Sequence, residues 1–151
     1  MENVLKHELI RARYMAIDKE SLLKEMTDFL FSKGYVNSAD DFFKAVWNRE
    51  KVMSTGIGRG IAVPHGCHDT VKEFVISVWQ LIEPIPFEAI DDKPIFLVFM
   101  LAVPTEKRSN YMNKLAAISN FIRNPENVKK LNAAENNDAL FEQLQGIQFK
   151  D

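Results

Sequence analysis

The chain has one cysteine, Cys67, among its 151 residues. A single thiol excludes an intramolecular disulfide and fits a reducing compartment. The chain also lacks an apolar run of the roughly 20 residues that span a bilayer, and its first residues do not form the basic and apolar segments of a secretion signal. Direct insertion into a membrane is therefore not expected, and we expect a cytoplasmic protein.

An excess of charge of either sign is also missing. The 19 Lys and Arg residues nearly balance the 21 Asp and Glu residues, so the formal net charge is -2. A chain with this balance has no overall field that attracts a polyanion. The composition thus argues against nucleic acid as a partner.

Apolar residues are plentiful, at 46% of the chain. This share, at this length, is enough for the core of one ordinary domain, so we expect a single domain over residues 1–151. Apolar residues alternate imperfectly over 4–13, which is compatible with a first strand.

Two helix patterns follow. Asp18 is suited to cap a helix whose apolar residues recur on one face, and Gly34 provides its end. Ser38, with Asp41 three residues later, resembles a capping box and predicts a second helix. This second helix should end near residues 51–53, just before a glycine-rich run.

The second half of the chain predicts strands first and helices afterwards. Residues 74–79 and 95–103 are rich in β-branched and aromatic side chains, and the latter segment is apolar on both faces, as in a central strand. The loop between them is marked by Pro84, Pro86, Asp91 and Asp92. Further helices are expected at 111–122, 126–131 and 138–145. The order of elements indicates an α/β (α+β) fold, a three-layer α/β/α sandwich with a mixed β-sheet flanked by helices.

The run of residues 54–66 carries the most information about function. Glycines occupy alternate positions in it, which frees the backbone amides at Gly58 and Gly60 to converge on an anion. Pro64 then fixes the backbone just before His65. This arrangement suits a histidine that meets a phosphoryl group in a defined pose.

A neutral imidazole is a good nucleophile towards phosphorus near pH 7, provided that its second nitrogen is held as a donor and cations or amides bind the phosphoryl oxygens. Arg49, near the end of the second helix, is the cation that the sequence offers for this task. Thr55 could add a hydroxyl, and Glu50 could orient Arg49.

Other interpretations of the same residues stay open. A histidine after a glycine-rich turn is most often a hydrogen-bonded loop residue, and Arg49 would also be stabilised at the C-terminus of a helix. Cys67 and His68 raise the ideas of a zinc site and of a cysteine nucleophile, but the close spacing opposes zinc and no second feature selects the thiol. The glycines lack the spacing of a dinucleotide fingerprint and have no Walker lysine after them.

Taken together, these motifs resemble the enzyme IIA family of the bacterial phosphoenolpyruvate-dependent sugar phosphotransferase system, in its fructose, mannitol and nitrogen-regulatory branch. The resemblance extends over nearly the whole chain, and the combination of Arg49-Glu50 with the glycine run and Pro64-His65 is specific. The segments that carry it are residues 19–23, 33–36, 48–50, 54–58, 60–66 and 102–104.

The resemblance implies that His65 accepts a phosphoryl group from the carrier HPr and passes it to a cysteine of an enzyme IIB, with Arg49 steadying the group. It implies no metal and no organic cofactor. Many relatives have a second histidine early in the third helix, and here that position is Tyr111, which cannot supply positive charge. The substitution motivates the alternative, a regulatory module that binds a transcription regulator or transporter according to its phosphorylation state.

Overall fold

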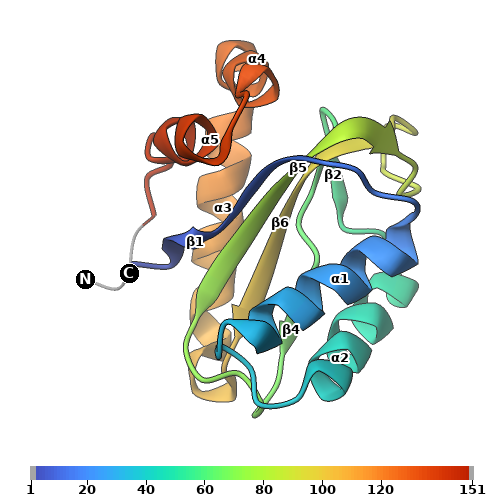
Figure 1. Cartoon of the computed structure of the whole chain (residues 1–151), viewed down its shortest axis with the longest axis vertical. Coiled ribbons are helices and arrows are strands. Elements are labelled where there is room, and N and C mark those ends of the chain that lie inside the picture. The colour runs from blue at the N-terminus through green and yellow to red at the C-terminus, as the bar shows by residue number, and fades with distance from the viewer. Residues whose placement is uncertain (1–2, 150–151) are drawn as a thin grey trace.

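The computed structural model describes residues 3–149 (Figure 1). The first half runs through β1 (Leu5–Tyr14), α1 (Lys19–Ser32), α2 (Ala39–Val52), β2 (Gly56–Gly58), β3 (Ile61–Ala62) and β4 (His65–Cys67). The second half runs through β5 (Val75–Ile85), β6 (Ile95–Val103), the short 3-10 helix η1 (Thr105–Asn110), α3 (Tyr111–Ile122), α4 (Pro125–Ala133) and α5 (Asn137–Leu144).

The strands form one mixed sheet with the order β1-β5-β6-β3-β2. Antiparallel pairing of β5 with β6 builds its centre, and β1 extends it in parallel on the β5 side. On its other side, β6 pairs in parallel first with β3 and then with β4. The expected mixed sheet between helical layers is confirmed.

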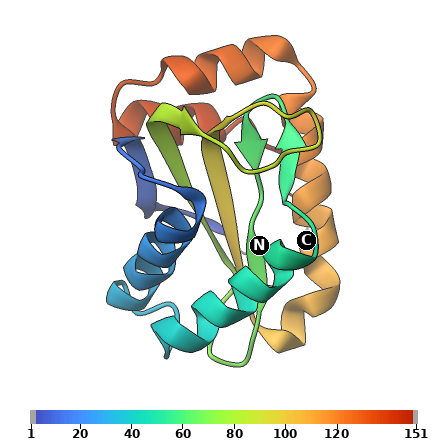
Figure 2. The same ribbon diagram turned by 90° about the vertical axis from the view of Figure 1, so that its right-hand side faces the viewer.

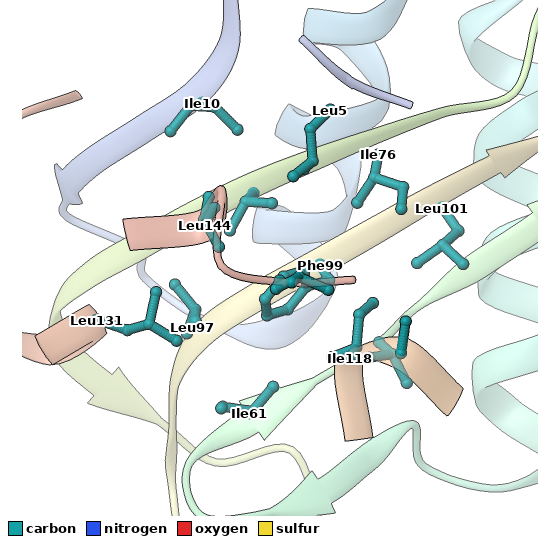
Figure 3. Packing of buried hydrophobic residues seen from close by; sticks show 14 of the residues in the cluster. Leu5, Ile10, Ile61, Ile76, Leu97, Phe99, Leu101, Ile118, Leu131 and Leu144 are labelled. Carbon is teal, nitrogen blue, oxygen red and sulfur yellow. The ribbon is translucent and has the colours of Figure 1, made fainter. Parts of the chain in front are cut away.

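Both faces of the sheet are covered, as the apolar pattern of residues 95–103 predicted. Every residue of β6 is buried. One face packs against α1 and α2, which face the viewer in Figure 2. The other face packs against α3, α4 and α5, where Phe99 and Leu101 of β6 meet Ile118 of α3 (Figure 3).

The helices begin where the sequence places their caps. The Asp18 carboxylate accepts a hydrogen bond from the Ser21 amide at 2.8 Å, and the Ser38 hydroxyl accepts one from the Asp41 amide at 3.1 Å. Gly34 adopts a φ of 84° just after α1, which a glycine does without strain. These caps fix the start of α2 and therefore the place of its last turn, which carries Arg49.

Two expectations about loops need correction. Pro84 lies inside β5, because the strand continues to Ile85 through a stretch of irregular register with β6, where an exposed proline removes no ladder hydrogen bond. The glycine-rich run is a β2–β3 hairpin whose turn, Gly58-Arg59-Gly60, has positive φ at all three residues. The alternate glycines serve this turn.

Candidate active site

His65 begins the short strand β4, which pairs with β6 and lies between α2 and α3 (Figure 1). Side chains alternate along a strand, so His65 and Cys67 point to the face covered by α3, while Gly66 points to α2. This alternation places the imidazole beside Tyr111, the first residue of α3, with ring centroids 5.2 Å apart.

Gly66 sets the distance between α2 and the histidine strand. A Cβ atom at this position would lie 3.0 Å from side-chain carbons of Phe42 and of Val46, which is closer than ordinary packing allows. The missing side chain lets α2 pack directly on β4. Arg49 follows Val46 by one helical turn and so reaches the level of the imidazole.

A hydrogen bond to the backbone orients the imidazole. Nδ1 of His65 lies 3.0 Å from the carbonyl oxygen of Val63. A carbonyl oxygen only accepts, so Nδ1 carries the proton and Nε2 keeps its lone pair. The ring is thereby set up for attack through Nε2.

The surroundings of His65 favour its neutral form. Burial of the ring lowers the pKa of His65 below the usual value of about 6.5, and the positive charge of Arg49 lowers it further, while the Val63 hydrogen bond and Glu50 act in the opposite direction. At neutral pH the lone pair on Nε2 is therefore available.

The imidazole borders a small surface cavity of about 280 Å³. The structure brings together here three of the residues that the sequence singled out: His65, Arg49 and Tyr111. Nη1 of Arg49 donates to the carbonyl oxygen of Met53 at 2.8 Å, which ties the guanidinium to the end of α2. The remaining lining residues are Ala45, Gly66, Cys67, Val103 and Arg108.

Glu50 does not orient Arg49, contrary to the expectation from sequence. Glu50 is buried, and its two carboxylate oxygens accept from the amide and the hydroxyl of Thr55 at 2.8 and 2.6 Å. Lys19 at the start of α1 completes this group, with Nζ 2.9 Å from the carboxylate. The physical reason is the direction of the helix: Glu50 points into the α1–α2 layer, whereas Arg49 points to the sheet edge.

Thr55 consequently acts through its backbone. Its hydroxyl is bonded to Glu50, but its carbonyl oxygen accepts from the amide of Val63 at 3.0 Å. Val63 in turn presents its own carbonyl oxygen to His65. Glu50, Thr55, Val63 and His65 thus form one continuous chain of hydrogen bonds that ends at Nδ1.

Gly58 and Gly60 are not brought to the imidazole. Ile61, next to this turn, pairs with Leu97, whereas His65 pairs with Leu101. Four residues of strand separate the two positions, or about 13 Å. The turn instead packs against the segment before β6, because a Cβ atom at Gly60 would meet the ring of Phe96 at 2.6 Å.

Sequence reasoning missed Arg108, which contacts Cys67 at the cavity. Nε of Arg108 lies 3.4 Å from Sγ of Cys67. The alternation of side chains along a strand could have predicted that Cys67 lies on the same face of β4 as His65. Arg108 carries no such signal, since residues 105–110 have no apolar period.

Two features of residues 3–149 bear on other classes of site. No group of three or more His, Cys, Asp or Glu side chains is placed to hold a metal ion in this part of the chain. No helix formed by the same residues is long and apolar enough to span a bilayer.

Replacement of Glu50 by alanine should cost about 3 kcal/mol of unfolding free energy. The change leaves the buried Thr55 amide and hydroxyl without their acceptor and removes the carboxylate that pairs with the half-buried Lys19 ammonium. Urea denaturation of this variant, beside the exposed control Glu142→Ala, measures the cost. A loss as small as that of the control would show that the buried carboxylate does not stabilise the fold.

The pKa of His65 predicts the pH dependence of the free protein. A carbon or nitrogen NMR titration of the His65 ring should give a midpoint below pH 6.5, because burial and Arg49 disfavour the imidazolium. Between that midpoint and about 6.5 the unfolded chain binds the proton and the folded chain does not, so the unfolding free energy should decrease as the pH falls through this window. A midpoint above 6.5 would contradict this account of the site.

Residues 3–146 match the family model described as phosphoenolpyruvate-dependent sugar phosphotransferase system, EIIA 2. The chain is 34% identical to a nitrogen regulatory protein of Klebsiella oxytoca over 144 residues, 94% of this chain and 88% of that protein. It is 31% identical to a fructose-specific EIIA component of Haloferax volcanii, over 88% of this chain and 86% of the relative.

A solved structure agrees with these matches. The crystal structure of nitrogen regulatory protein IIA-Ntr from Neisseria meningitidis superposes with a TM-score of 0.86 at 27% identity, covering 93% of this chain and 96% of that one. The family suggested by the His65 and Arg49 motifs is confirmed: the chain belongs to the EIIA 2 family of the phosphoenolpyruvate-dependent sugar phosphotransferase system.

Proposed function

We propose that the chain is a phosphoryl carrier that accepts a phosphoryl group on Nε2 of His65 from phosphorylated HPr and passes it to a cysteine of an enzyme IIB. The observation that carries the proposal is the pairing of an oriented imidazole with a guanidinium at one cavity. Nδ1 is tied to Val63, and Arg49 borders the same space. The family to which the chain belongs supports phosphoryl transfer as the reaction at this site.

The chemistry balances without a cofactor. The lone pair of His65 Nε2 attacks phosphorus in line with the donor's nitrogen, so one N–P bond forms as the other breaks. Charge on the three equatorial oxygens is stabilised by Arg49, and the Nδ1 proton stays on the ring, bonded to Val63. Onward transfer reverses these roles, with a thiolate of enzyme IIB as the attacking group.

The surface around the cavity suits a protein donor and a protein acceptor. Val52 and Met53 at the end of α2 are 81% and 69% exposed, and Met112 at the start of α3 is 59% exposed. Val52 and Met53 lie within about one turn of Arg49, and Met112 follows Tyr111, so exposed apolar side chains are close in sequence to two lining residues of the cavity. A rim of this kind allows transient docking of two carriers in turn.

Reconstitution tests the proposal. The chain should become phosphorylated when incubated with phosphoenolpyruvate, enzyme I and a compatible HPr, and the label should be stable to base and labile to acid, as an N–P bond is. Omitting HPr should leave the chain unlabelled. If the complete mixture leaves it unmodified, the carrier role is wrong.

A second candidate function is regulation, with the phosphorylated and unphosphorylated forms binding a regulator or transporter differently. One observation favours it: several similar proteins are named nitrogen regulatory proteins. The resemblance to the family adds a second reason, because it implies a second histidine at the position of Tyr111 in many relatives. The carrier and the regulatory function differ in whether the phosphoryl group then passes to an enzyme IIB. A labelled chain that donates to no enzyme IIB encoded beside it would support regulation, whereas rapid loss of label to such an enzyme IIB would support transport.

A further inference from the structure

The cavity beside His65 has a second guanidinium. Arg49 enters it from the last turns of α2, and Arg108 enters it from η1, the 3-10 helix that precedes α3. The two cations therefore come from elements on opposite faces of the sheet, with His65 on the strand between them. Neither guanidinium forms an ion pair with a carboxylate within residues 3–149.

The contact of Arg108 with Cys67 uses only Nε and leaves the other N–H groups of the guanidinium available. Nε is directed to Sγ of Cys67, so the fork formed by Nη1 and Nη2 makes no hydrogen bond with the described residues. The carboxylate of Asp69, which is also close enough to act on the charge of Arg108, accepts instead from the Thr105 hydroxyl at 2.6 Å. Arg108 thus has a free, planar fork of the kind that binds phosphate oxygens.

Cys67 places that fork near the reacting nitrogen. His65 and Cys67 share one face of β4, about 7 Å apart along the strand. Arg108 and His65 also line the same cavity, so a phosphoryl group on Nε2 would enter the space that the guanidinium borders.

We propose that Arg108 is a second phosphoryl-binding residue, which contacts the oxygens of phosphorylated His65 on the side opposite Arg49. This inference rests on the proposed function and adds to it. A phosphoryl group on Nε2 carries close to two negative charges, and two guanidinium groups on opposite walls match them. Arg108 in this way supplies a positive charge at a cavity to which Tyr111 contributes only a ring and a hydroxyl.

The test compares Arg108→Gln with Arg123→Gln, which removes the same charge from an exposed site at the far end of α3. Single-turnover transfer from phosphorylated HPr should slow by about ten-fold to a hundred-fold in Arg108→Gln and stay at the wild-type rate in Arg123→Gln. The effect is smaller than for a buried donor because Arg108 is exposed to solvent and salt. Arg108→Lys should recover part of the rate.

A second readout separates binding of the phosphoryl group from docking of HPr. In a ³¹P NMR titration of the phosphorylated protein, loss of Arg108 should raise the second pKa of the phosphoryl group by about 0.5 to 1 unit, because a nearby cation favours the dianion. The sample can be made with phosphoramidate, which phosphorylates imidazoles without a protein donor. The pKa readout therefore stands even if HPr proves to be the wrong donor.

Each result has one meaning. Slower transfer together with a raised phosphoryl pKa supports the inference. Slower transfer with an unchanged phosphoryl pKa would show that Arg108 contacts the carrier protein only, and rates and pKa values equal to those of Arg123→Gln would show no role; both overturn it. A wild-type chain that phosphoramidate labels and HPr does not would refute the proposed donor and leave the pKa comparison to decide on Arg108.

Discussion

Replacement of His65 by glutamine should reduce phosphorylation by the HPr system to below detection. Glutamine is close in size and keeps an N–H that can donate to the Val63 carbonyl oxygen, but its amide nitrogen has no nucleophilic lone pair. The variant should fold, because His65 is only partly buried and contributes no charge to the core. Intact-mass measurement in base-stabilised samples gives the extent of modification.

His68→Gln is the matched control, since it removes the other imidazole of the same segment. His68 Nδ1 accepts from the Thr70 amide at 3.0 Å and belongs to the turn after β4, so we expect its loss to leave labelling intact. Labelling of the His65 variant at the wild-type level would place the acceptor elsewhere in the chain. Loss of labelling in the His68 variant alone would exchange the roles of the two residues.

Replacement of Arg49 by glutamine should slow phosphoryl transfer to His65 by about 10² to 10³ fold. Arg49 is held to the Met53 carbonyl oxygen, so its charge is in place before the reaction begins and needs no reorganisation. Removing one such preorganised donor typically costs this factor. Lysine at this position should be intermediate, because it keeps the charge and loses the fork.

Lys51→Gln provides the comparison for Arg49, since it removes an exposed charge from the same end of α2. Quenched-flow transfer from labelled HPr should give a rate near the wild type for this control. The Arg49 variant should also show a higher pKa for His65 than the wild type, because the cation lowers that pKa. Equal rates for the two variants would remove Arg49 from the phosphoryl site.

The elements of the fold could be predicted because their signals are local. Asp18 and Ser38 cap the helices that they were expected to cap, and an apolar run without alternation became the buried central strand β6. Strand pairing could not be predicted in this way, because it depends on segments that are distant in sequence. Whether the glycines at 58 and 60 formed an anion cradle or a hairpin turn depended on where the segment before β6 lies, and no residue near them in sequence encodes that.

In the candidate site, too, sequence motifs identified some residues, but the sequence could not give their contacts. His65 and Arg49 stand in recognisable motifs, and the structure brings them to one cavity. Thr55 was expected to serve the phosphoryl group and Glu50 to orient Arg49, but the two bond to each other, because sequence spacing does not give the direction of a side chain. The apolar residues of the glycine-rich run do not form an exposed surface, since Ile61 and Val63 are buried and Ile57 is half-buried. The exposed apolar side chains near the site belong to the ends of α2 and α3.

The position of β4 also bears on solubility. It pairs with β6 along one side, and no strand in residues 3–149 pairs with its other side, so it is an open edge of the kind that recruits strands from other molecules. Two features oppose such aggregation: the strand is three residues long, and unneutralised arginines flank it. The charges proposed here to hold a phosphoryl group would therefore also keep neighbouring copies of the chain apart.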